Sequence, residues 1–96
     1  MTSALTTLTA NGYGTPVQIG ASGKLSIVVR DTSVFGGATV VIANSGNNTN
    51  YGRSGVIKDN DTEKTRVVTG IVGEYAKVGA ENCGLSTSIL VDIVSD

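Results

Sequence analysis

The sequence predicts an all-β protein, an antiparallel β-sandwich with a jelly-roll-like arrangement of about eight short strands. The first observation is composition: the 96 residues include 13 Val, 7 Ile and 12 Thr, so a third of the chain is β-branched. Such side chains fit a pleated surface better than a helix. The second observation is that apolar residues recur with period two. The third is that 13 glycines, with clusters of Asn and Asp, separate these runs by turn signals.

Three segments carry the clearest strand patterns: 24–31, 37–44 and 86–94. In each of them every second residue is apolar, so one face of the strand is expected to line the core. In the first segment, for example, Leu25 and Ile27 share a face. Weaker strand candidates are 4–9, 15–19, 55–58, 64–70 and 74–77.

Glycine and asparagine are expected to make the turns between these strands. Asn11-Gly12 suits a tight type I′ reversal, because both residue types tolerate a positive φ. Gly36-Gly37 stands directly before a strand and permits a bulge or a close approach of two backbones. The other predicted turns are 44–50, which is the longest polar stretch and a predicted surface loop, and 59–61.

Length and charge bound the classes of partner. With 96 residues and a mass of 9.7 kDa, the chain is expected to form a single β-sandwich domain over 1–96. Seven basic and eight acidic side chains give a net charge of -1, which argues against nucleic acid because phosphate binding needs clustered positive charge. The N-terminus has no secretory pattern, and no apolar run approaches the roughly 20 residues that span a bilayer. We therefore expect no membrane partner and assembly in a cytoplasm.

The sequence offers no histidine, no activated cysteine and no metal-ligand cluster from which an enzyme site could be assembled. There is no histidine, which removes the usual general base and the commonest metal ligand. The lone Cys83 therefore lacks a base to activate it and is interpreted as a passive thiol near a turn. Asp59, Asp61 and Glu63 alternate, but a solvated turn is favoured over a cation site. We expect no enzymatic activity, no metal and no cofactor.

The large polar aromatic residues are Tyr13, Tyr51 and Tyr75, alongside one Phe and no Trp. Flat aromatic rings serve as platforms in carbohydrate or peptide recognition. Packing at the edge of the core is the favoured interpretation of these tyrosines, and a glycan-binding role is the alternative.

The segment 34–42, Val-Phe-Gly-Gly-Ala-Thr-Val-Val-Ile, resembles a recurrent pattern in small virion proteins of tailed bacteriophages. Those proteins tend to open with a Thr-Leu-Thr-Ala-Asn-Gly-x-Gly-Thr-x-Val segment, matched here by 7–17, and to end on a strand such as 86–94. Where they often carry an Asp-Gly-x-x-Trp hairpin, this chain has 44–50 followed by Tyr51. The resemblance implies a β-sandwich subunit that is often an outer capsid decoration (cement) protein and sometimes a head-fibre or tail component.

From this resemblance we expect a structural protein on the capsid surface of the virion, bound to the major capsid protein. Because a small domain with few large apolar residues gains stability by association, a homo-oligomer is expected. The local threefold positions of a capsid favour a trimer. The alternative is a tail or head-fibre module that recognises a host surface glycan. Terminal segments and loop tips reach partners most easily, although both are equally compatible with plain solvation. The candidate capsid or intersubunit contacts are Thr2, Leu5, Thr7, Leu8, Asn47, Asn48, Asn50 and Tyr51.

Overall fold

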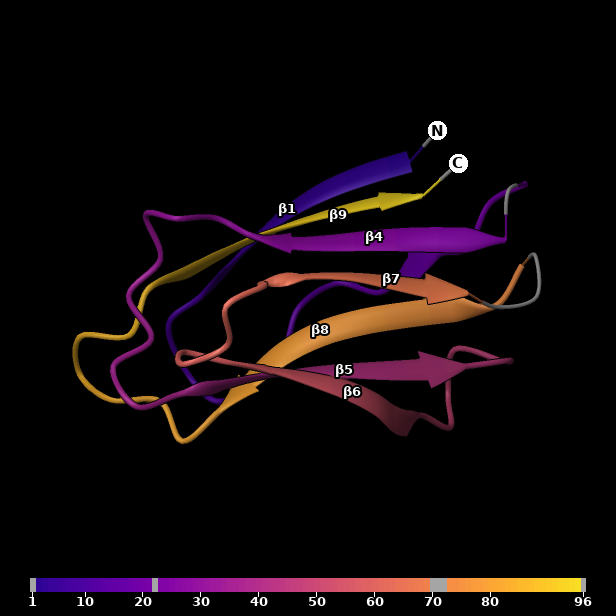
Figure 1. The fold of residues 1–96 in the computed structure, drawn as a ribbon. Helices are drawn as coiled ribbons and strands as arrows, with labels where there is room; N and C mark the ends of the chain where they lie inside the picture. The colour runs from indigo at the N-terminus through magenta and orange to yellow at the C-terminus, as the bar shows by residue number, and fades with distance from the viewer. Residues whose placement is uncertain (1, 22, 70–72, 96) are drawn as a thin grey trace.

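Two antiparallel sheets pack face to face and enclose one apolar layer (Figure 1). The structure is a computed structural model that describes residues 2–21, 23–69 and 73–95, with side chains described for 5–21, 23–67 and 73–94. No helix that could span a membrane occurs in these described ranges. The strands described are β1 (Thr2–Leu8), β2 (Gly12–Tyr13), β3 (Val17–Gln18), β4 (Lys24–Val29), β5 (Thr39–Ser45), β6 (Gly52–Lys58), β7 (Thr65–Thr69), β8 (Tyr75–Glu81) and β9 (Ile89–Ser95).

Sheet A has the strand order β1-β9-β4-β7, and sheet B has the order β2-β8-β5-β6. β3 also pairs with β8, so β2 and β3 act together as one interrupted strand at that edge of sheet B. Apart from the step within this pair and the β5–β6 hairpin, each successive strand lies in the opposite sheet. This wrapping is the jelly-roll arrangement, which confirms the predicted all-β antiparallel sandwich.

Each of the eight predicted strands appears in the structure, with shifted ends, and β2 is added to them. The last strand begins later than predicted because the chain first makes a turn in which Thr87 N donates to Gly84 O at 3.3 Å. Ser88 then forms an isolated bridge with Val34 before the ladder of β9 begins. The predicted end of the 64–70 segment, residue 70, lies outside the described residues.

The predicted type I′ reversal at Asn11-Gly12 is wrong. Gly12 has a φ of 132°, and Asn11 is not among the described non-glycine residues with a positive φ. Because β1 and β2 belong to different sheets, this segment crosses between sheets and does not close a hairpin. The backbone N–H of Cys83 donates to Asn11 Oδ1 at 2.9 Å and holds the crossing in place. The thiol-bearing side chain of Cys83 is half-buried and packs against the core.

Alternation along the strands places the core between the sheets. On β4, Leu25 and Ile27 are fully buried while Val28, on the other face, is half-buried. β5 is the exception, because Val41 and Ala43 are buried although they face away from this core. The buried core cluster consists of Leu8, Val17, Leu25, Ile27, Val29, Phe35, Ala38, Val40, Ile42, Ile57, Ala76, Val78, Ala80, Ile89, Val91 and Ile93.

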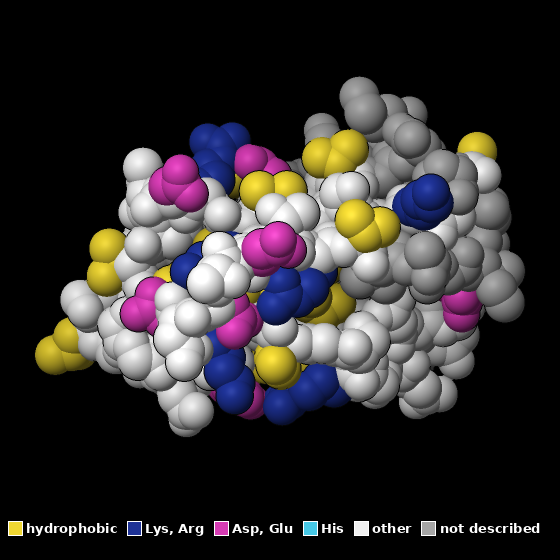
Figure 2. Space-filling view, viewed as in Figure 1, with side chains coloured by type: hydrophobic (Ala, Val, Ile, Leu, Met, Phe, Trp, Pro, Cys, Tyr) yellow, Lys and Arg dark blue, Asp and Glu magenta, His cyan; other side chains and the backbone are white. Residues whose placement is uncertain are grey.

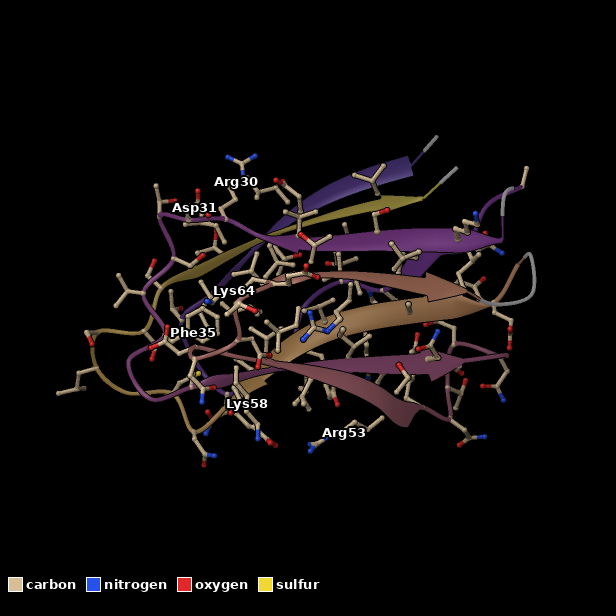
Figure 3. All side chains as sticks on the ribbon, in the orientation of Figure 1. Arg30, Asp31, Phe35, Arg53, Lys58 and Lys64 are labelled. Carbon is tan, nitrogen blue, oxygen red and sulfur yellow. The ribbon has the colours of Figure 1, made fainter. Side chains whose placement is uncertain are left out.

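Phe35 and the two glycines after it close one end of the sandwich (Figure 3). Gly36 and Gly37 have φ values of 59° and 91°, a region that favours glycine. A Cβ on Gly36 would lie 3.1 Å from the backbone nitrogen of Thr87, so the predicted close approach of two backbones is confirmed. The Thr87 hydroxyl donates to Phe35 O at 2.8 Å and accepts from Gly84 N at 2.8 Å. One buried hydroxyl therefore joins the β4–β5 and β8–β9 connections.

Candidate binding surfaces

The predicted N-terminal contacts lie on a paired strand and not on a free arm. β1 pairs with β9 over its whole length. Because side chains alternate along a strand, Leu5 and Thr7 point outward and are exposed, while Leu8 points inward and is only 5% exposed. Leu8 is thus a core residue and has no surface to offer a partner, which corrects its predicted contact role. The side chain of Thr2 lies outside the described residues.

Leu5 belongs to a wider surface, the outer face of sheet A. The register aligns Leu5, Asp92, Val28 and Thr65 in one row across the four strands. Leu5 and Val67, on the two edge strands, are 55% and 59% exposed. Figure 2 shows hydrophobic side chains scattered among charged and other polar ones on the side of the molecule where β4 and β7 lie. The described side chains of this face are Leu5, Thr7, Lys24, Ser26, Val28, Thr65, Val67, Leu90, Asp92 and Val94.

An ion pair balances the charge of Asp92 on this face. Arg30 Nε donates to Asp92 Oδ2 at 2.7 Å, and its Nη2 donates to Oδ1 at 3.2 Å. These hydrogen bonds, together with the negative charge of Asp92, raise the pKa of Arg30. Arg30 lies at the upper margin of the molecule in Figure 3. The pair leaves apolar and hydroxyl side chains as the dominant chemistry of the outer face of sheet A.

The predicted polar loop begins after β5, which ends at Ser45. Asn47 Oδ1 accepts hydrogen bonds from the backbone N–H groups of Thr49 and Asn50, both at 3.0 Å, and from Ser45 Oγ at 2.9 Å. Asn48 has a φ of 59°, a conformation that asparagine tolerates better than most residues. The oxygen of Asn47 therefore shapes the loop, whereas the exposed Asn48 and Asn50 remain available to a partner.

Tyr51 connects this loop to the outer face of sheet B. Its hydroxyl donates to Asn48 Oδ1, and its ring centroid lies 4.0 Å from Lys77 Nζ. The same ammonium lies 4.4 Å from the ring centroid of Tyr13. Burial raises the pKa of Tyr51, and the nearby Tyr75 raises it further. The three tyrosines thus gather on an outer sheet face, which corrects the expectation that they pack at the edge of the core.

Gly79 explains how the Tyr13 ring reaches this position. The register puts Tyr13 opposite Gly79 and Gly79 opposite Val41. A Cβ on Gly79 would lie 2.8 Å from Tyr13 Cδ1, so the ring occupies the space that a side chain would fill. In the next row Lys77 lies opposite Ala43. We attribute the burial of Val41 and Ala43, which are 3% and 1% exposed, to this layer of side chains.

A second ion pair borders the tyrosines. Arg53 Nη2 donates to Glu81 Oε2 at 2.9 Å, and because β6 and β8 flank β5, the pair crosses β5. The hydrogen bond to Glu81 and its charge raise the pKa of Arg53, and Tyr13 contributes in the same direction. Arg53 and Lys58 lie at the lower margin of Figure 3. Sequence reasoning missed Arg53 and Lys77; the available signal was the alternation that places Lys77 on the same face as Tyr75.

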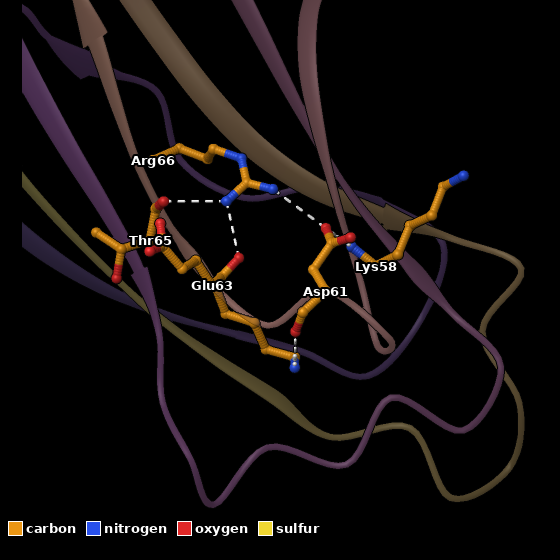
Figure 4. A network of polar contacts seen from close by, with 6 residues as sticks. Lys58, Asp61, Glu63, Thr65 and Arg66 are labelled. Carbon is orange, nitrogen blue, oxygen red and sulfur yellow. Dashed lines mark hydrogen bonds and ion pairs between the residues drawn. The ribbon is translucent and has the colours of Figure 1, made fainter.

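The segment between β6 and β7 is a turn, as predicted, and its polar network is drawn in Figure 4. Asp61 Oδ2 accepts from Lys58 N at 2.9 Å and from Arg66 Nη2 at 3.1 Å. Arg66 Nη1 also donates to the carbonyl oxygens of Glu63 and Thr65, at 2.8 and 3.0 Å. The carboxylate of Asp61 is thus used to shape the turn. Within the described ranges, no three His, Cys, Asp or Glu side chains gather as a metal-binding group.

No protein-family model, no curated protein and no solved structure matches this chain. Function is therefore inferred from the outer faces of sheets A and B themselves. They lie on opposite sides of the sandwich (Figure 1).

Proposed function

We propose that this protein is a non-enzymatic structural subunit that decorates the outside of a tailed-bacteriophage capsid. The outer face of sheet A would bind the major capsid protein and join neighbouring shell subunits. This added interface area would oppose the pressure of packaged DNA. The protein would be assembled onto the virion in the host cytoplasm.

The difference between the two outer faces is the observation that carries this proposal. On sheet B, the protein's own tyrosines, lysine and arginine cover the apolar residues Val41 and Ala43. On sheet A, Leu5 and Val67 are more than half exposed, with half-buried Val28 between them. Interface cores are depleted in charged residues, and removal of apolar surface from water drives association. An uncovered sheet face on which apolar and hydroxyl side chains dominate suits a partner surface better than bulk water.

Two measurements test the proposal: the copy number of the chain in virus particles and the binding of variants on the outer face of sheet A. Quantitative mass spectrometry of purified particles of the virus that encodes this chain should find it in a simple ratio to the major capsid protein. The Leu5→Asp variant is then added to particles from which this protein has been removed. It should bind them at least about tenfold more weakly than the wild type does, since a carboxylate is desolvated at the interface. Leu85→Asp is the matched control, because Leu85 is fully exposed away from this face.

Equal binding of the Leu5→Asp and Leu85→Asp variants would overturn the assignment of the face. Absence of the chain from purified particles would overturn the virion proposal as a whole.

A second candidate function is recognition of a host surface glycan by a tail or head-fibre module. The observation that favours it is the gathering of Tyr13, Tyr51 and Tyr75 on the outer face of sheet B. A few copies per particle, confined to the tail or a vertex, would favour this function over capsid decoration.

A further inference from the structure

We propose that the outer face of sheet B binds a carboxylate-bearing polysaccharide, with Lys77 pairing the carboxylate and Tyr13 stacking against the sugar ring. This inference rests on the second candidate function, glycan recognition, and names the class of glycan. It is independent of docking through sheet A, since the two faces lie on opposite sides of the sandwich.

Lys77 offers a positioned cation. Its ammonium lies between the rings of Tyr13 and Tyr51, at 4.4 and 4.0 Å from their centroids. It makes no ion pair with a described carboxylate, whereas the neighbouring Arg53 is paired with Glu81. Ring faces attract cations but leave the ammonium hydrogen-bond donors unused. An incoming carboxylate would supply the missing acceptors.

Tyr13 offers the stacking surface. Its side chain is 43% exposed, and its ring lies over Gly79, where a Cβ would come within 2.8 Å of it. Tyr51 is held by its hydrogen bond to Asn48 and flanks the same ammonium. The rings are therefore placed before a ligand arrives, which lowers the entropic cost of binding.

The chemistry around the rings favours a saccharide over nucleic acid. Exposed amides of Asn48 and Asn50 are near in sequence to Tyr51, and such groups complement sugar hydroxyls. A polysaccharide carries its carboxylates at wide intervals, so one unpaired ammonium can match one of them. A nucleic acid presents a phosphate at every nucleotide and is bound through several cations, in a chain whose net charge is -1.

The test is binding of polygalacturonate, alginate and polysialic acid to the full chain by isothermal titration calorimetry, each beside its carboxyl-reduced neutral form. At least one acidic polymer should bind, and its neutral form should bind about tenfold more weakly, because a charge-assisted hydrogen bond is lost. Lys77→Gln should lose the same factor and Lys77→Arg should retain binding. Lys24→Gln, which removes an equal charge from sheet A, is the control.

The outcomes separate the two levels of the proposal. Equal binding of an acidic polymer and its neutral form, with no effect of Lys77→Gln, would overturn the role of Lys77 and leave glycan recognition standing. Failure of all three acidic polymers and their neutral forms would overturn both. Binding of a single-stranded oligonucleotide in preference to every polysaccharide would overturn the ligand class. Circular dichroism and thermal melting of each variant establish that it is folded before binding is compared.

Discussion

At the scale of single residues, the absence of one side chain shapes the outer face of sheet B. Gly79 has no positive φ, so its importance is steric and not conformational. A Cβ there would collide with Gly12 O and would lie 2.9 Å from Tyr13 Cα. Both atoms belong to the backbone of β2 and cannot rotate away. A larger residue would therefore push β2 from the edge of β8.

We predict that Gly79→Ala destabilises the fold by about 1–3 kcal/mol, the usual cost of overpacking. Equilibrium unfolding in urea measures this change. Gly55→Ala, in β6 of the same sheet, is the matched control, since its Cβ would meet only Ile42 Cδ1 at 3.7 Å, an ordinary contact. If the two variants unfold at the same urea concentration, the close approach of β2 to Gly79 is wrong.

The raised pKa of Tyr51 predicts an alkaline loss of stability. Burial, and then the neighbouring Tyr75, raise this pKa above the ordinary value of 10.0. The unfolded chain therefore releases the Tyr51 proton at a lower pH than the folded chain does. The contribution of Tyr51 to stability is fully present below pH 10.0 and is lost as the pH rises through the folded pKa.

Urea unfolding of the wild type and of Tyr51→Phe, below and above pH 10.0, measures this linkage. The variant lacks the titrating hydroxyl, so the wild type should lose more stability than the variant above that pH. The variant also lacks the hydrogen bond to Asn48, and this loss lowers its stability by a constant amount at every pH below 10.0. Parallel pH profiles across the range would contradict the raised pKa.

At the scale of secondary-structure elements, the sequence predicted where the strands lie better than which strands pair with one another. Alternation identified β4 and β9 because their residues have one clearly apolar face. β2 escaped prediction because a two-residue strand has no period, and Asn11-Gly12 has the composition of a hairpin turn. Pairing is set by contacts between distant segments, so the positions of Tyr13 and Lys77 beside each other could not be predicted. Tyr51 was predicted as a capsid or intersubunit contact because a polar loop next to a strand is a local pattern, and that role stays a prediction.

Two connections at one end of the sandwich depend on Thr87, whose side chain is buried. We predict that Thr87→Val costs about 1–3 kcal/mol, since it removes two hydrogen bonds worth about 0.5–1.5 kcal/mol each. Gly84 N loses its acceptor, and within the described part of the chain Phe35 O keeps only the hydrogen bond from Ala38 N. Thermal and urea unfolding measure the loss. Thr15→Val, at an exposed position with no side-chain hydrogen bond among the described contacts, is the control and should change stability little. Equal stability of the two variants would contradict the role of Thr87 as the tie between these connections.

At the scale of the whole molecule, the jelly-roll separates two kinds of surface. Sheet A turns an uncovered, apolar and hydroxyl-bearing face outward, and sheet B turns a covered face with tyrosines and charges to the opposite side. A subunit attached to a shell through sheet A would hold the tyrosines of sheet B away from that shell. Capsid decoration and glycan recognition therefore do not compete for the same residues, and the two functions are compatible in one chain.

The sheet edges bear on the expected homo-oligomer, for which the local threefold positions of a capsid favour a trimer. In the described structure β1 and β7 of sheet A, and β6 and the interrupted strand β2–β3 of sheet B, each pair on one side only. Neighbouring copies can cover such edges. Sedimentation velocity at micromolar concentration should give a mass three times the 9.7 kDa of the chain. Because association stabilises only the folded state, the melting temperature should also rise with protein concentration. A monomer with a concentration-independent melting temperature that still coats capsids would contradict the trimer and leave docking through sheet A intact.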